Sequence, residues 1–159
     1  MCVNRCAVTN AYISGTGFYV PPREVTNEAL IAEYGIETTH EWIVQRTGIR
    51  ERRIAAPEEL TSTLAIAAAK QALADARMDA KELDLVICAT VTGDHPMPAT
   101  AVLVQQKLGA PNCPAFDISA ACAGFVYGLT IADAFIATGR ARRPPRPAPR
   151  GCAASRSRT

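Results

Sequence analysis

Apolar and small residues alternate near the beginning of the chain, and helical spacing follows once two prolines have interrupted that pattern. Residues 11–20, AYISGTGFYV, predict a first strand that ends at Pro21-Pro22. Thr26-Asn27-Glu28 is typical of a helix start, because a threonine side chain can accept a hydrogen bond from an unpaired amide of the first turn. The helix predicted over 29–34 ends at Gly35, a residue that tolerates a left-handed C-cap.

A second short helix and a charged segment come next. Thr38, Thr39 and His40 precede a predicted helical turn over 41–46, which Thr47-Gly48 interrupts. Residues 49–53 read IRERR, and this density of charge indicates a solvated strand or a loop.

The middle of the chain alternates between helical and strand patterns. An alanine-rich helix is predicted over 64–76, with its N-cap in Thr61-Ser62-Thr63. The continuous apolar run 85–91, LVICATV, is typical of a strand that is buried on both faces. After a loop, the spacing predicts a helix over 100–108 that ends at Gly109.

The last predicted elements are a short strand over 115–118 and a helix over 122–138. The alternation of strands and helices favours a layered α/β sheet. Ligands in open α/β sheets usually bind at the carboxyl ends of the strands, so the turn at 119–121 is a candidate site.

Helix 122–138 is almost wholly apolar, because only Thr130, Asp133 and Thr138 are polar. This pattern predicts a helix that is buried all round. Gly124 and Gly128 share one face, and glycine costs about 1 kcal/mol in a helix interior. We therefore expect another element to approach this face closely.

Length and composition are those of one ordinary globular domain. The chain has 159 residues, of which 48% are hydrophobic and 20% charged. It holds no apolar stretch of the length that a membrane span needs, and its first residues do not resemble a secretion signal. These features lead us to expect a cytoplasmic protein without a membrane partner.

The charge is unevenly distributed along the chain. Residues 1–139 hold 10 basic and 15 acidic residues, whereas residues 140–159 hold seven arginines, four prolines and no acid. Such a tail cannot form a packed element and reads as a disordered basic segment. We therefore divide the chain into an extension at 1–10, a folded domain at 11–139 and an Arg/Pro-rich tail at 140–159.

Six cysteines are present, but they form no CxxC pair, and the chain has only two histidines. A zinc site or a disulfide framework is therefore not expected, and we predict no metal. Most buried cysteines only pack, and Cys88 and Cys113 are interpreted in this way. Cys122 differs because it follows a strand and a three-residue turn at the start of a helix, where unpaired amides favour a thiolate.

Three segments together resemble β-ketoacyl-acyl-carrier-protein synthase III, a thiolase-fold condensing enzyme. They are ISGTGFYVPPREVTN at 13–27, EWIVQRTGIRERRIAAPEE at 41–59 and CPAFDISAACAGFVYGL at 113–129. The resemblance extends over about residues 11–139. It implies the N-terminal half of a thiolase-like layered αβαβα fold, which is incomplete here and is followed by the basic tail.

The resemblance also implies a reaction and its residues. Cys122 would accept an acetyl group from acetyl-CoA, and its backbone amide would contribute to the oxyanion hole. Decarboxylative condensation with malonyl-carrier protein would then initiate fatty-acid synthesis. Thr38, Trp42 and Arg46 would bind coenzyme A; without the resemblance, Trp42 would be interpreted as a core aromatic residue.

Further implications concern the acyl pocket and the partners. Met97 corresponds to a position that lines the acyl pocket across a homodimer, whereas His95 is interpreted as a surface residue. The implied partners are acyl-CoA and acyl carrier protein. Acyl-CoA is the substrate, and no cofactor is implied.

The sequence departs from the family after residue 139. The family's helper histidine and asparagine, and a second arginine that binds coenzyme A, lie in a half that this chain does not show. A frameshifted or truncated gene product is one hypothesis for the tail, and the other two reading frames of the DNA near codon 142 would test it. We expect the chain alone to aggregate, to associate or to stay partly molten.

Three interpretations of the function remain. The chain is the initiating condensing enzyme or its N-terminal part, or a related acyltransferase for a natural-product starter unit. Alternatively, it is a fragment that loads an acyl group without condensing it. A third interpretation, nucleic-acid binding through the tail, is the weakest because the tail has no interleaved aromatic residues.

Overall fold

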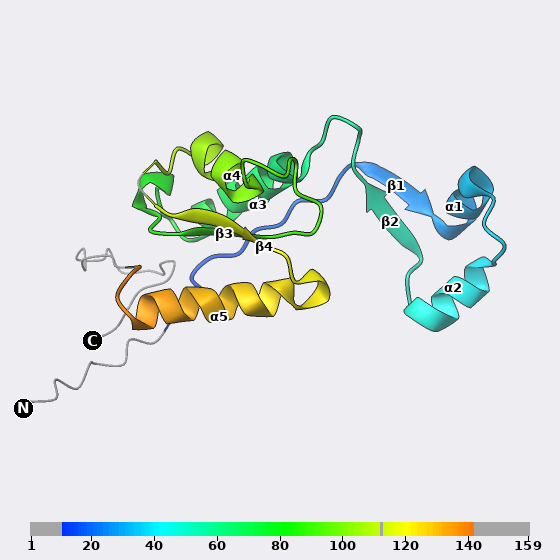
Figure 1. Ribbon diagram of the computed structural model, residues 1–159. Coiled ribbons are helices and arrows are strands. Elements are labelled where there is room, and N and C mark those ends of the chain that lie inside the picture. Colours follow the sequence, from blue (N-terminus) through cyan, green and yellow to red (C-terminus); the bar gives the residue numbers. More distant parts are fainter. Residues whose placement is uncertain (1–10, 112, 142–159) are drawn as a thin grey trace, which may run out of the picture. The chain divides into compact units, whose positions relative to one another are not determined.

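The computed structural model describes residues 11–111 and 113–141. The predicted extension at 1–10 and the tail from 142 onward lie outside the described residues. The described residues form two compact units (Figure 1). Unit 1 contains residues 11–18 and 61–141, unit 2 contains residues 19–60, and each is described by itself.

Unit 2 is a two-stranded antiparallel sheet with two helices between its strands. Strand β1 (Arg23–Thr26) pairs with β2 (Glu51–Ile54), so that Arg23 faces Ile54 and Thr26 faces Glu51. Helices α1 (Asn27–Tyr34) and α2 (His40–Thr47) connect them. The charged segment thus forms a strand, one of its two predicted states.

The ends of both helices in unit 2 confirm the sequence prediction. Thr26 Oγ1 accepts a hydrogen bond from the Ala29 amide at 3.2 Å, and Thr39 Oγ1 accepts one from the Trp42 amide at 3.2 Å. Gly35 and Gly48 end the helices with φ angles of 61° and 74°. These left-handed angles suit glycine, which has no Cβ to clash with the carbonyl.

Unit 1 is a layered α/β arrangement. Its helices are α3 (Thr61–Asp75), α4 (Thr100–Leu108) and α5 (Gly124–Ala137), with 3-10 turns at Ala80–Glu82 and Ala121–Ala123. Strands β3 (Val86–Ala89) and β4 (Ala115–Ile118) pair in parallel. Helices α3 and α4 cover one face of this sheet and α5 covers the other (Figure 1). The α/β fold class is confirmed.

The strand predicted over 11–20 is wrong, because within the described residues this segment pairs with no other strand. Its amides bond to α3 side chains instead: Thr16 N donates to Asp75 Oδ2 at 2.9 Å and Phe18 N to Gln71 Oε1 at 3.3 Å. Gly15 makes this approach possible, since a Cβ at that position would lie 2.7 Å from the Ala76 nitrogen. A strand needs a neighbouring strand, which an alternating pattern alone does not provide.

The core of unit 1 lies mainly beneath α4, where Ala101, Val104, Ala110 and Cys113 are buried. Strand β3 is only half-buried, so its predicted burial on both faces is wrong for the described chain. Helix α5 is likewise not buried all round. Its inner face meets the sheet, with the Phe116 and Phe135 rings 6.3 Å apart, whereas its outer face is exposed.

Candidate functional site

The chain turns sharply between β4 and α5, and Cys122 lies in this turn. After Ile118, the 3-10 turn Ala121–Ala123 is closed by a hydrogen bond of 2.9 Å from the Ala123 amide to the Ala120 carbonyl. Ala121 has a φ angle of 42°, a left-handed conformation that is uncommon for a residue with a Cβ. Cys122 itself is exposed.

The predicted start of the helix at Cys122 is therefore wrong by two residues. The α-helix begins at Gly124, because a left-handed residue at 121 cannot belong to the helix and the next residues form the tighter 3-10 turn. The strand–turn–helix arrangement around the thiol remains as the sequence predicts. Non-glycine residues in left-handed conformations cluster at functional sites, where the surroundings hold them in place.

The carboxyl ends of β3 and β4 lie at the same edge of the sheet, because the two strands are parallel. The Thr90 amide continues the pairing with a hydrogen bond of 3.1 Å to the Ile118 carbonyl. The loop after β3 carries Met97, which is 87% exposed, and His95, which is exposed as predicted. The loop that holds Met97 and the turn that holds Cys122 thus follow neighbouring strands.

Two carboxylates cap the helices at this edge, and neither cap was predicted from the sequence pattern. Asp117 accepts hydrogen bonds of 2.7 Å from the amides of Thr100 and Ala101, the first residues of α4. Asp94 Oδ1 accepts one of 2.9 Å from the amide of Ser62 in the first turn of α3. Helix α3 therefore begins at Thr61 itself. The carboxylate of Asp94, from the loop after β3, caps it in place of the cap predicted within 61–63.

Asp94 is held in its charged form. Burial alone would raise the pKa of this carboxyl, but the hydrogen bond from Ser62, together with the nearby His95 and Lys107, lowers its pKa below the usual value of 3.8. The capping carboxylate is consequently ionised at neutral pH.

The other two cysteines of the described residues behave as packing residues, as predicted. Cys88 lies in β3, and burial together with the charges of Asp117 and Asp94 raises the pKa of its thiol. Cys113 is buried, and this burial raises the pKa of its thiol. Neither thiol is favoured as a thiolate, which leaves Cys122 as the exposed cysteine among the described residues.

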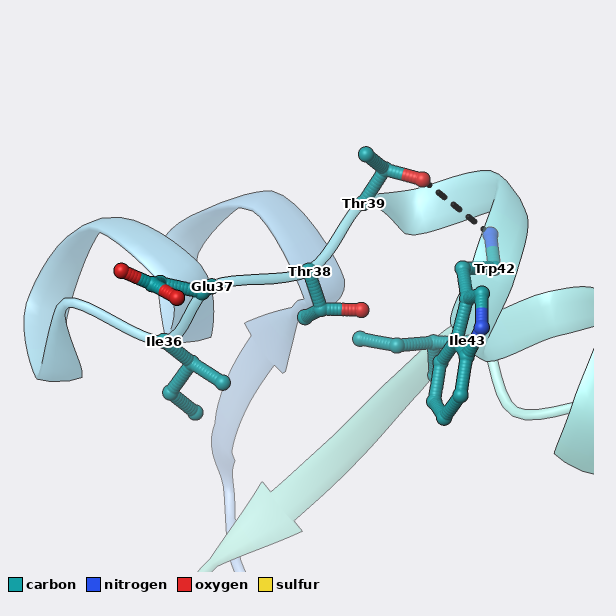
Figure 2. A pocket seen from close by; sticks show the side chains of 6 residues that line it. All are labelled: Ile36, Glu37, Thr38, Thr39, Trp42 and Ile43. Carbon is teal, nitrogen blue, oxygen red and sulfur yellow. Dashed lines mark hydrogen bonds between the residues drawn. The ribbon is translucent and has the colours of Figure 1, made fainter.

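A shallow pocket in unit 2 contains two of the three residues predicted to bind coenzyme A. Its volume is about 630 Å³, and its lining residues are Ile36, Glu37, Thr38, Thr39, Trp42 and Ile43. Figure 2 shows the Trp42 indole beside the Thr38 side chain. Trp42 is 54% exposed, so it is not a core aromatic residue.

Arg46 lies one helical turn after Trp42 on α2. Its guanidinium carbon is 5.8 Å from the centre of the indole ring, within the range of a cation–π contact. An exposed aromatic face next to a guanidinium is an arrangement that can stack on a base and bind a phosphate. Thr38, Trp42 and Arg46 therefore belong to one face of unit 2, whereas Cys122 and Met97 belong to unit 1.

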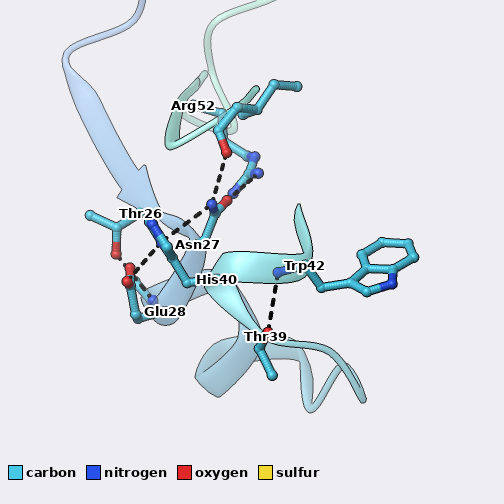
Figure 3. A network of polar contacts seen from close by, with 9 residues as sticks. Thr26, Asn27, Glu28, Thr39, His40, Trp42 and Arg52 are labelled. Atoms are coloured by element: carbon cyan, nitrogen blue, oxygen red, sulfur yellow. Dashed lines mark hydrogen bonds and ion pairs between the residues drawn. The ribbon is translucent and has the colours of Figure 1, made fainter. Parts of the chain in front are cut away.

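Unit 2 also contains polar contacts that the sequence pattern did not predict. The fully buried Asn27 donates from Nδ2 to the Ile49 carbonyl at 2.8 Å and accepts at Oδ1 from Arg52 Nη2 at 2.8 Å (Figure 3). Glu28 Oε1 lies 2.8 Å from His40 Nδ1. The only sequence signal at Asn27 was its place after the Thr26 cap, which says nothing about partners more than 20 residues away.

Within the part of the chain that the structure describes, no group of three or more potential ligands is arranged to hold a metal ion. In the same residues, none of the helices has the length and apolar character needed to cross a membrane.

Known proteins share this fold and these motifs. A sequence profile of 3-oxoacyl-[acyl-carrier-protein] synthase III matches residues 116–144, which include the turn with Cys122. β-Ketoacyl-[acyl-carrier-protein] synthase III of Neisseria gonorrhoeae is 53% identical over 133 residues. The chain is similar to part of synthase III. The match covers 83% of this chain but 41% of that relative, so the chain spans about two fifths of the length of the curated relative.

Solved structures agree with this relationship. The crystal structure of 3-oxoacyl-[acyl-carrier-protein] synthase III from Aquifex aeolicus is 50% identical and superimposes with a TM-score of 0.78, over 84% of this chain and 42% of that one. The priming β-ketosynthase of the R1128 polyketide pathway is 42% identical with a TM-score of 0.79, over 83% and 39%. The chain thus has part of a thiolase-like synthase III fold.

Proposed function

We propose that this chain is the acyl-accepting part of an acyltransferase of the 3-oxoacyl-[acyl-carrier-protein] synthase III type. The observation that carries the proposal is the exposed thiol of Cys122 in the turn between β4 and α5, within the segment that matches the synthase III profile. The relatives' names supply the reaction class.

The chemical step at Cys122 is a thioester exchange. The thiolate attacks the carbonyl carbon of acyl-CoA and forms a new carbon–sulfur bond, while the bond to coenzyme A breaks and the coenzyme A thiolate leaves and takes up a proton. The backbone amide of Cys122 would donate to the oxyanion during this step. One thioester replaces another, so the exchange needs no cofactor besides the acyl-CoA substrate.

Coenzyme A would be held by Thr38, Trp42 and Arg46. The half-exposed indole offers a face on which adenine can stack, and Arg46 provides a positive charge 5.8 Å from the centre of that ring. Thr38 lines the same pocket, so its hydroxyl would lie near an adenine stacked on Trp42.

The later steps extend the proposal. Condensation with malonyl-carrier protein would release CO2 and initiate fatty-acid synthesis, in a homodimer of the complete enzyme located in the cytoplasm. The histidine and asparagine for this step would come from residues that the chain does not show. A chain without them would load an acyl group and stop.

A second candidate within the same class is an acyltransferase for the starter unit of a natural product. The similarity to the R1128 priming β-ketosynthase supports it, because its TM-score of 0.79 matches the 0.78 of the Aquifex enzyme. The acceptor distinguishes the two candidates, and the acyl-loading step is common to both.

The test has two stages. The chain is incubated with radiolabelled acetyl-CoA, and we expect label on the wild type and none on Cys122→Ser, with Cys88→Ser as the matched control that retains it. Malonyl-carrier protein is then added, and a ketoacyl product identifies a condensing enzyme. Loading without product identifies the loading fragment, and a wild type that acquires no label at residue 122 would refute the proposed function.

Met97 would adjust the acyl chain that the site accepts. Its side chain is exposed in the described chain and is unbranched, so it can adapt to primers longer or more branched than acetyl. We expect Met97→Phe to shift loading toward acetyl-CoA, measured against butyryl- and isobutyryl-CoA. An unchanged chain-length preference would argue against a pocket role for this residue.

A further inference from the structure

The side chain of Asn27 is fully buried, although it is polar, and it lies where β1 leads into α1. Both ends of its amide have partners: Nδ2 donates to the Ile49 carbonyl and Oδ1 accepts from Arg52, each at 2.8 Å. Its backbone amide also donates to the Arg50 carbonyl at 3.2 Å. Buried polar groups persist when they are hydrogen-bonded in this way, and removing one partner leaves the others unsatisfied.

These partners lie just beyond the C-terminal end of α2. Gly48 is the C-cap of the helix, and Ile49 and Arg50 are the next two residues. The two hydrogen bonds from Asn27 therefore fix the point at which the chain leaves α2 and enters β2.

The N-terminal end of α2 is held by the neighbouring residue. His40, the first residue of α2, places Nδ1 2.8 Å from Glu28 Oε1. Hydrogen bonds from the Glu28 backbone and the Thr26 hydroxyl lower the pKa of Glu28, so its carboxylate is ionised and the histidine Nδ1 must carry the donated proton. The approach of Asn27 Nδ2 to that nitrogen, at 3.5 Å, is then a packing contact.

Helix α2 contributes no side chain to a fully buried core. None of its residues is buried, so an apolar core does not hold it as it holds α4. The polar contacts at its two ends, with Asn27 and Glu28 as consecutive residues of α1, remain as the anchors shown in Figure 3.

We propose that Asn27 is a positioning residue for the nucleotide end of acyl-CoA, because with Glu28 it clamps both ends of α2 and so orients Trp42 and Arg46. This inference rests on the proposed function for the ligand, but the clamp itself is a property of unit 2. The side chain of Asn27 bonds to Ile49 and Arg52 rather than to Trp42 or Arg46, so it acts through the helix that carries them.

The experiment uses the full 159-residue chain and two ligands that divide acyl-CoA into its parts. Adenosine 3′,5′-bisphosphate probes the nucleotide site, and quenching of Trp42, the single tryptophan of the chain, reports its binding. S-acetyl-N-acetylcysteamine carries the same acetyl thioester without a nucleotide and probes loading at Cys122. Hydrogen exchange of the α2 amides, compared with those of α4, measures the clamp without any ligand.

For Asn27→Ala we expect nucleotide binding to weaken on the order of tenfold and amide exchange in α2 to accelerate on the order of tenfold. The cause is that the buried partners of Asn27 lose their hydrogen bonds. Exchange in α4 and loading from S-acetyl-N-acetylcysteamine stay unchanged, while loading from acetyl-CoA falls. Asn27→Asp retains the acceptor for Arg52, so its nucleotide binding and α2 exchange should lie between those of the wild type and Asn27→Ala. Gln45→Ala removes an exposed amide from α2 as the matched control and leaves every measurement at the wild-type value.

Each result decides a separate question. Unchanged α2 exchange in Asn27→Ala would overturn the clamp, and an equal fall in loading from both acetyl donors would show general destabilisation instead of positioning. If Asn27→Ala does not fold, Glu28→Ala tests the same clamp from an exposed carboxylate and must accelerate exchange at the N-terminal end of α2. A wild type that does not bind adenosine 3′,5′-bisphosphate refutes the proposed function of this face, while α2 exchange still decides the clamp.

Discussion

Gly124 packs directly against Ala89: a Cβ atom built on Gly124 would lie 3.1 Å from the Cβ of Ala89. The first turn of α5 thereby meets the last residue of β3 at the edge that carries Cys122. The close approach of helix and strand explains why glycine is present here despite its cost in a helix. Gly128, on the same face of α5, has no contact as close as this one.

We expect opposite effects on stability from substitutions at these two glycines. Gly124→Leu should lower the free energy of unfolding by about 1–3 kcal/mol, because the larger side chain cannot enter the contact with Ala89. Gly128→Ala should raise it by about 0.5–1 kcal/mol, since an alanine Cβ would meet Ile118 Cδ1 at an ordinary 3.7 Å and alanine favours the helix. Urea unfolding followed by circular dichroism measures both, and equal effects of the two substitutions would contradict the packing described.

The three described cysteines should differ in reactivity. Thiolates are the reactive form, and burial raises the pKa of the thiols of Cys88 and Cys113, whereas Cys122 is exposed. Brief treatment of the native chain with iodoacetamide at pH 7 should therefore label Cys122 at least about tenfold faster than the other two. Peptide mass spectrometry measures the labelling, with the urea-unfolded chain as the control in which all three react. Preferential labelling of Cys88 would argue against this account.

Helix ends were predictable from the sequence because their interactions are local. Thr26 and Thr39 cap helices through amides three residues away, and Gly35, Gly48 and Gly109 end helices through their own backbone conformation. A short window of sequence contains everything that these features need. The thiol site was located for the same reason, since strand, turn and helix are contiguous around it.

Features that depend on distant partners were missed or misplaced. The amide of Ser62 receives its cap from Asp94, 32 residues away, and Asn27 bonds to residues 22 and 25 positions further along. The alternation over 11–20 indicated a strand, but side chains of α3 bind its amides instead. Pattern alone cannot determine which partner a polar group will meet in the folded chain.

Asp94 should make the stability of unit 1 depend on acidity. Its pKa in the folded chain lies below the usual 3.8, so the carboxylate stabilises the fold most above that value and loses this contribution as the pH falls through the folded pKa. Asp94→Asn should therefore destabilise the chain at pH 7. The difference in the free energy of unfolding from wild type should shrink between about pH 5 and pH 3, the range around the usual pKa of an aspartate.

Urea midpoints measured at several pH values test this expectation. Asp75→Asn is a suitable comparison, because Asp75 also accepts an amide hydrogen bond, from Thr16. A difference between Asp94→Asn and wild type that stays constant from pH 7 to pH 3 would show that the charge of Asp94 does not contribute to capping α3.

The outer face of α5 should cause the chain to associate. Phe125 is 71% exposed and Val126 60% exposed, and Tyr127 and Leu129 are exposed beside them. Soluble monomers rarely expose contiguous apolar patches larger than a few hundred Å². We expect sedimentation velocity to detect association of the wild type at micromolar concentrations, and Phe125→Glu to reduce it by placing a charge within the patch. Tyr34→Glu, at an exposed aromatic residue of unit 2, is the control that leaves association unchanged. A monomeric wild type with a sharp, reversible unfolding transition would contradict this prediction, because it would show that the chain tolerates the exposed face of α5 without a partner.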